Sequence, residues 1–537
     1  MKPLALSQKL AGAVAASATL VACTSGWGAY DSPDYGYGRG ASTSSSGYFV
    51  VDGGARGNKD TYLDAGIRAE CIDWSGFGGR GCFDCEPQTN DELLIACTDA
   101  RYEEFDDETR IAGYSAATPR PALPPRGPDL PPFVGDHPSE PGEPLPPAPP
   151  CPISTKPNPV MVLGATGLPF ETIARAMGSA ATIFYAERGS CEGVASMLIG
   201  EPKLSGEIVY FDADGTKNRC TLSGEHPADV TTSALFATTC AGESGLSEQL
   251  TLPANVEDYV GPANTVMFTV PATARERAIS AAAAYKVFGF GAGSGVAPWT
   301  NEELVFRRRA SSGNQQTVAL SLGLPPDALR GRDANGSSNM LAAIRTSPNP
   351  QATIGFSSSE IVDPNRDVLK ALAYKHYVQP VAFYPDSDPA SFDRRNVRDG
   401  HYYMWLPLHV LARTSAGEPI AVANPHLDPT GAKKSARDDT VRRLVYVMTS
   451  RQEPPVRSVD LFGALKRTGN VPQCAMHVQR AREAAPLEPY TPTSPCDCAF
   501  EAAAPGATPP ECKPCASSFD CAGDRPVCSF GYCEGAR

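Results

Sequence analysis

The fold is decided by the stretch Val160-Met161-Val162-Leu163-Gly164-Ala165-Thr166-Gly167 and by the residues that follow it up to Tyr185. Residues 160–163 are all apolar, as in a buried strand, and the glycines after them are typical of a turn. Residues 169–177 have helical character, and residues 181–185 form a second strand-like run. Strand, turn, helix and strand in this order predict an α/β layered domain.

We expect this domain to span residues 153–480. A segment of this length buries a sizeable core and is usually divided into two lobes. Further strand-like runs lie at residues 266–270, 354–356 and 381–384, and residues 272–287 are alanine-rich and helical in character.

Four segments of this domain carry groups that could hold an anion: residues 164–167, 188–194, 228–233 and 307–315. The first lies between a strand and a helix, where backbone N–H groups carry partial positive charge and Thr166 adds a hydroxyl. Glycines on both sides of Ser190 allow a ligand to approach the backbone closely. The fourth contains three arginines, whose planar guanidinium groups suit carboxylate or phosphate. Taken singly, each segment is more often a structural turn or a solvated face.

In order and spacing, the four segments together resemble the anion-binding loops of type 2 periplasmic solute-binding proteins, especially the phosphate-binding branch. The resemblance covers about residues 157–425 and implies an α/β, two-lobed domain that closes around a small oxyanion. It places the two crossovers between the lobes at residues 265–271 and 352–355. The ligand-binding residues that it implies are Thr166, Gly167, Ser190, Ser233, Arg308, Ser312, Gly313 and Asn314.

The sequence departs from the pattern of this family at three positions. Ala234 follows Ser233 where the family usually has an aspartate, which accepts the proton of hydrogen phosphate. Ala310 stands where an acidic partner of the arginine is usual, and Asn314 replaces a threonine. Without a proton acceptor, the site loses the physical basis for preferring phosphate over sulfate.

The first 22 residues predict a secretory signal peptide, with Lys2 and Lys9 before a short apolar run. The run ends in Leu20-Val21-Ala22-Cys23, which resembles a bacterial lipobox. This resemblance implies cleavage before Cys23 and lipid attachment to its thiol, and several acyl chains hold a protein on a bilayer almost permanently. Because Thr24 rather than aspartate follows, we expect an anchor in the outer membrane of a bacterial envelope.

Cysteine content and charge limit the function further. Of 17 cysteines, 16 remain when Cys23 is set aside, and an even number outside the cytoplasm indicates disulfides. Zinc remains an alternative, because Cys82 and Cys85 have a metal-ligand spacing and the tail repeats it. The formal charge of −13 argues against nucleic acid as a partner.

Shorter segments flank the domain. Residues 23–70 are rich in glycine, serine and tyrosine and predict a flexible tether, and residues 71–117 form a small Cys-rich segment. Residues 118–152 are a Pro-rich linker: from 119 to 152, 15 of 34 residues are proline, which favours polyproline II. We expect it to act as a spacer between the membrane and the domain. Residues 481–537 form a Cys-rich tail.

The predicted function is non-covalent capture of a small, phosphate-like oxyanion and its delivery to an ABC permease or a sensor. The alternative is a structural or adhesive surface lipoprotein in which the solute-binding fold persists but the site has decayed. An enzyme is the third choice, since no pair of nucleophile and base, no cofactor motif and no metal motif stands out within the domain.

Overall fold

The computed structural model of the chain describes residues 66–115, 119–134, 146–503 and 509–535. All of them belong to one structural unit. The predicted signal peptide, the lipidation site Cys23 and most of the predicted tether lie outside the described residues.

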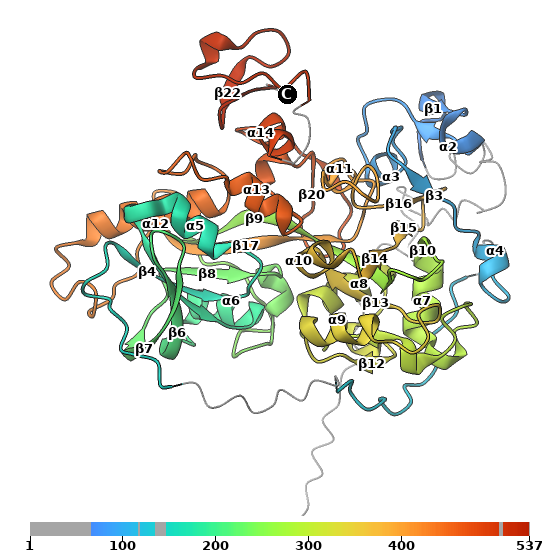
Figure 1. Cartoon of the computed structure of the whole chain (residues 1–537), viewed down its shortest axis with the longest axis horizontal. Coiled ribbons are helices and arrows are strands. Elements are labelled where there is room, and N and C mark those ends of the chain that lie inside the picture. Colours follow the sequence, from blue (N-terminus) through green and yellow to red (C-terminus); the bar gives the residue numbers. More distant parts are fainter. Residues whose placement is uncertain (1–65, 116–118, 135–145, 504–508, 536–537) are drawn as a thin grey trace, which may run out of the picture. The chain divides into compact units, whose positions relative to one another are not determined.

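The first lobe is built on the predicted strand–helix–strand unit (Figure 1). β4 (Pro159–Gly164) pairs in parallel with β5 (Thr182–Glu187) on one side and with β8 (Val230–Ser233) on the other. α5 (Phe170–Met177) connects β4 to β5, and α6 (Ser190–Ile199) follows β5. The predicted α/β layers are therefore confirmed.

Antiparallel strands complete the sheet of the first lobe. β6 (Leu204–Phe211) and β7 (Lys217–His226) continue it beyond β5, while β17 (Trp405–Ser415) pairs with β8 at the other side. The long helix α12 (Lys434–Met448) packs against α5, β4 and β17.

One long strand, β9 (Val256–Pro271), joins the two lobes. Its first part pairs with β17, and its second part pairs with β13 (Gly355–Ser358) and β14 (Leu369–Ala371). The crossover predicted at residues 265–271 is therefore confirmed.

The second predicted crossover, at residues 352–355, is wrong. Gly355 pairs with Thr269 in the second lobe, and the chain returns to the first lobe only through β17, which begins opposite Thr265. A short buried strand has the same apolar pattern whether it connects two lobes or ends inside one, so the sequence did not distinguish these cases.

The second lobe carries a four-stranded sheet and three main helices. Its strands, in spatial order, are β10 (Ala278–Ser280), β15 (Ala373–Lys375), β16 (Ala382–Phe383) and β3 (Tyr102–Glu103). Its helices are α7 (Ala281–Phe290), α8 (Gly313–Leu322) and α9 (Ser337–Arg345). Since β3 comes from the N-terminal Cys-rich segment, that segment completes a sheet of the main domain.

Aromatic side chains fill the core of this lobe. Phe268 of β9 stacks on Phe288 of α7 with ring centroids 5.5 Å apart, and Phe288 meets Phe356 edge to face at 5.6 Å. All three side chains are fully buried. Each fully buried phenylalanine contributes about 1.5–3 kcal/mol by leaving water, so β9 is fixed firmly against the helix layer.

The described parts of the Pro-rich linker lie against the two lobes. Near its start, Tyr285 of α7 donates to the carbonyl of Pro121, and Phe133 donates its amide to the carbonyl of Asp333. Near its end, Thr221 of β7 donates to the carbonyl of Pro149, two residues before the disulfide Cys151–Cys220. These parts therefore do not form the predicted free spacer, because proline carbonyls still accept hydrogen bonds from a neighbouring surface.

Every cysteine within the described residues forms a disulfide, as predicted. The pairs are Cys71–Cys85, Cys82–Cys97, Cys151–Cys220, Cys191–Cys240, Cys474–Cys496, Cys498–Cys512, Cys515–Cys528 and Cys521–Cys533. The Cys clusters that could have bound zinc thus use their sulfurs for one another. No described helix has the length and apolar character needed to cross a membrane.

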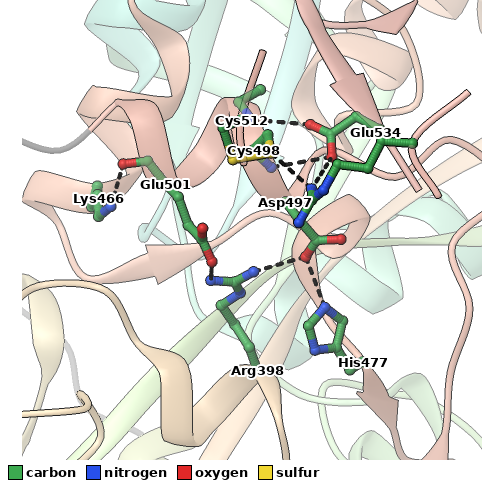
Figure 2. The surroundings of a disulfide bond; sticks show 10 residues. Arg398, Lys466, His477, Asp497, Cys498, Glu501, Cys512 and Glu534 are labelled. Carbon is green, nitrogen blue, oxygen red and sulfur yellow. Dashed lines mark hydrogen bonds and ion pairs between the residues drawn. A yellow bond between two sulfur atoms is a disulfide. The ribbon is translucent and has the colours of Figure 1, made fainter. Parts of the chain in front are cut away.

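The C-terminal tail is attached to the main domain by a buried polar network (Figure 2). Arg398 donates to Asp497 at 2.7 Å and to Glu501 at 2.8 Å, both on α14 (Asp497–Ala502). Glu534, near the end of the chain, accepts the amides of Cys498 and Ala499 at 3.1 and 3.0 Å. The tail is therefore packed as part of the same unit, although its sequence composition sets it apart.

Candidate functional site

A cavity of about 340 Å³ lies between the lobes, where the predicted anion segments meet. The first lobe lines it with the turn after β4, the start of α6 and Ala234. The second lobe lines it with the segment before α8, the start of α8, the start of α9 and Glu360. The lining residues are Ala165, Thr166, Glu187, Arg188, Gly189, Ser190, Ala234, Arg308, Arg309, Ser311, Ser312, Gly313, Asn314, Asn335, Gly336, Ser337 and Glu360.

Close packing of backbone against backbone positions the first-lobe side of the cavity. Gly164 has a φ of +141°, and a Cβ at this position would collide with the carbonyl oxygen of Thr232 on β8. A Cβ at Gly193 of α6 would strike the same oxygen. These two glycines let α6 approach β4 and β8 closely, which brings the N-terminus of α6 to the end of the sheet.

Ser190 is the first residue of α6 and lines the cavity. Its Oγ accepts the amide of Ala234 at 3.0 Å, so its own hydroxyl hydrogen remains available to a ligand. Glu192 accepts the amide of Gly189 at 2.9 Å and fixes the turn before the helix. Thr166 is exposed at the same cavity.

α8 presents its N-terminus from the second lobe. Its N-cap residue Ser312 makes no side-chain cap bond, and the amides of the first turn have no partner within the helix. Gly313 and Asn314 follow, and Asn314 donates through its amide side chain to Ser358 at 3.1 Å. The helix start therefore offers uncommitted N–H groups with partial positive charge to the cavity.

Arg308 is held between α8 and α9. Its backbone amide donates to Gln315 of α8 at 2.8 Å, and its Nη1 donates to Ser337, the first residue of α9, at 2.7 Å. Burial lowers the pKa of the guanidinium group, which nevertheless remains charged at neutral pH. A partly buried cation in a fixed orientation suits a phosphate or carboxylate group.

The structure brings six of the eight predicted ligand-binding residues to this cavity: Thr166, Ser190, Arg308, Ser312, Gly313 and Asn314. Gly167 and Ser233 do not line it. The carbonyl of Gly167 accepts a hydrogen bond from Asn470 at 3.0 Å. Ser233 is fully buried, and its hydroxyl donates to the carbonyl of Leu235 while accepting the amide of the same residue. Whether the six bind a ligand stays a prediction.

Several lining residues were missed from the sequence, above all Ser337 and Glu360. The signal available in the sequence was the turn-like run Asn335-Gly336-Ser337, which leads into α9. In the structure Gly336 has a φ of +137°. Glu360 offered none, because it reaches the cavity through tertiary packing. Its carboxylate accepts Ser358 Oγ at 2.6 Å and Asn264 Nδ2 at 2.9 Å.

Ala234, which replaces the expected aspartate, lies close to the second lobe. A Cβ at Gly313 would lie 3.4 Å from the Cβ of Ala234. The two lobes are therefore close at this point, and the carboxylates in the cavity belong instead to Glu187 and Glu360.

Polar and charged groups line the cavity. No histidine or cysteine is among the described residues that line it. The donors are amides, hydroxyls and guanidinium groups, which bind an anion without forming a bond to it.

Comparisons with known proteins were made for the sequence and for the structure. No family model matches the sequence, and no curated relative matches it. Among solved structures, a possible phosphate-binding protein from Planctomyces limnophilus is 12% identical, with a TM-score of 0.30 over 55% of this chain and 100% of that chain. A putative phosphate ABC transporter substrate-binding protein from Clostridium perfringens, solved with bound phosphate, is 11% identical, with a TM-score of 0.32 over 55% and 98%. The reduced regulatory domain of OxyR from Pseudomonas aeruginosa is 9% identical, with a TM-score of 0.28 over 53% and 96%.

The strand order of the chain itself gives the two-lobed α/β architecture that the resemblance implied.

Proposed function

We propose that this protein captures a small, phosphate-like oxyanion non-covalently between its two lobes. The observation that carries the proposal is the meeting of three helix N-termini, those of α6, α8 and α9, with Arg308 at one cavity. Each N-terminus contributes about half a positive charge, and the four groups come from both lobes. An anion held there gains from closure of the lobes, and it is neutralised locally although the protein as a whole is acidic.

The proposed setting is the bacterial cell envelope. A signal peptide ending before Cys23 and a lipid on that cysteine would anchor the chain to a membrane, which we propose to be the outer one. Cys23 is the one cysteine of the sequence outside the eight disulfide pairs, which supports a separate use for its thiol. Delivery to an ABC permease or to a sensor would follow capture.

Calorimetric titration of the purified full chain with inorganic phosphate and with sulfate tests the proposal. We expect one site per chain and a rise in melting temperature with ligand, since a ligand at 100 times its Kd stabilises the folded state by about 2.7 kcal/mol. Arg308→Ala should weaken binding by at least about tenfold, because it removes charge-assisted hydrogen bonds worth about 1.5–3 kcal/mol.

Arg345→Ala is the matched control. Arg345 is exposed at the last turn of α9, so the variant loses the same charge from the helix that supplies Ser337 but leaves the cavity intact. The proposal is supported if Arg345→Ala leaves the affinity for the anion unchanged and Arg308→Ala lowers it. No heat and no thermal shift with any anion would contradict it and favour a structural or adhesive surface lipoprotein.

A further inference from the structure

The cavity contains charges of both signs that do not pair with one another. Within the described part of the chain, no carboxylate lies within 4.0 Å of the Arg188 or Arg308 side-chain nitrogens, and no lysine or arginine nitrogen lies within 4.0 Å of the Glu187 or Glu360 carboxylates. The neighbouring Arg307, by contrast, lies 3.3 Å from Asp129. Opposite charges that share a cavity without meeting are complementary to a ligand that carries both signs.

Two of these charges are fixed in place. Arg308 is oriented by its hydrogen bond to Ser337, and Glu360 by its hydrogen bonds to Ser358 and Asn264. Because Ser358 also accepts from Asn314 of α8, the carboxylate of Glu360 lies beside the proposed anion position without filling it. A bare oxyanion binds there against partial repulsion from this carboxylate, which a ligand that carries its own cation would relieve.

The size of the cavity also exceeds that of a simple oxyanion. Phosphate has five non-hydrogen atoms, and even at about 30 Å³ for each, the share of one molecule in liquid water, it fills less than about 150 Å³. The cavity has about 340 Å³, which lies at the lower end of the range of about 300–1,000 Å³ for organic ligands. About half of the space thus remains for a substituent.

We propose that the ligand is an aminoalkyl phosphate, a phosphomonoester that carries a protonated amine. Its phosphate lies at Arg308 and the helix N-termini, as in the proposed function on which this inference rests, and its ammonium group pairs with Glu360 and Glu187. A monoester fits better than a diester, because it leaves three oxygens for the converging donors.

Titration of the full chain with methyl phosphate and with phosphoethanolamine tests this proposal, because the two probes share a phosphate and only the second carries an amine. We expect phosphoethanolamine to bind at least tenfold tighter. Glu360→Gln should weaken phosphoethanolamine binding by at least threefold and leave methyl phosphate binding unchanged or stronger, since it removes a repulsive charge. Glycerophosphoethanolamine, a diester like a lipid headgroup, should bind at least tenfold more weakly than phosphoethanolamine.

Glu488→Gln serves as the control, because Glu488 is exposed and does not line the cavity. It should change neither affinity. Equal affinities for the two monoesters, or a Glu360→Gln variant that changes both in the same direction, would overturn the aminoalkyl phosphate while leaving oxyanion capture intact. Tighter binding of the diester would overturn the monoester and indicate a lipid headgroup. If inorganic phosphate and both monoesters fail to bind, both this inference and the proposed function are wrong.

Discussion

At the residue scale, two glycines determine how closely the first-lobe helix reaches the proposed anion position. A Cβ added at Gly193 of α6 would collide with the carbonyl oxygen of Thr232. It would also lie 3.2 Å from the Cα of Gly164. Protein interiors are close-packed, so even one methyl group at such a contact must displace backbone.

We therefore predict that Gly193→Ala destabilises the protein by about 1–3 kcal/mol, despite the higher helix propensity of alanine. It should also weaken anion binding, because α6 carries Ser190. Urea unfolding and calorimetry measure both effects. Gly293→Ala is the control, since among the described residues other than its chain neighbours no atom lies within 4 Å of its added Cβ, and it should change stability by less than about 0.5 kcal/mol. An equally small change in Gly193→Ala would show that the contact is not tight.

Two serines show how far single residues could be assigned from the sequence. Ser190 follows a glycine at a helix start, and the backbone geometry of that place directs it to the cavity. Ser233 ends a buried strand, where alternate side chains point to opposite faces, and its hydroxyl bonds to Leu235 instead. The sequence showed that both residues carry a hydroxyl, but it did not show in which direction each side chain points.

At the element scale, α14 is held to the main domain by a titratable cluster (Figure 2). His477 lies between Asp399 at 2.6 Å and Asp497 at 2.7 Å. Burial opposes its charge, but the hydrogen bonds to the two carboxylates outweigh burial and raise the pKa of His477. Burial also raises the pKa of Glu534 to about 7.

We predict that the tail docks less tightly to the main domain as the pH rises from 5 to 8. A histidine with a raised folded pKa stabilises fully below its unfolded pKa of about 6.5 and loses this effect as the pH rises through the folded value. Glu534 acts in the same direction, because a buried carboxylate with a raised pKa is destabilising once it ionises. Amide hydrogen-exchange protection of residues 497–502 should fall over this range.

Above pH 6.5, His477→Asn should remove most of the change of protection with pH. His426→Asn is the control, because His426 is exposed and is not part of the network. Protection that is independent of pH in the unchanged protein, or that rises toward pH 8, would contradict the assignment of charge to His477.

Elements with strong local patterns were predictable, and those made by distant pairing were not. The run from Val160 to Tyr185 correctly predicts β4, α5 and β5, because its periodicity is local. β3 is two residues long and pairs with β16 nearly 300 positions later, so no local signal marks it. The prediction of the second crossover was wrong for the same reason. Only the register of β13 on β9 shows that residues 355–358 belong to the second lobe.

At the scale of the whole molecule, the two lobes are joined through β9 and β17 and approach each other at the interlobe cavity. Asn470 links the two lobes near the crossover. Its side-chain amide donates to the carbonyl of Gly167, and its Oδ1 accepts a hydrogen bond from Asn264 of β9 at 3.0 Å. Asn264 in turn donates to Glu360. This chain of hydrogen bonds runs from a first-lobe turn to a second-lobe carboxylate, so an anion that touches both lobes stabilises the arrangement as a unit.

The central claim is that an oxyanion lies between the lobes at the N-termini of α6, α8 and α9. Its most direct test is a crystal structure of the protein with arsenate, recorded at the arsenic absorption edge. We predict one strong anomalous peak within hydrogen-bond distance of Arg308, Ser190 and the first amides of α8. Anomalous peaks confined to the outer surface, with none in this cavity at saturating arsenate, would contradict the account.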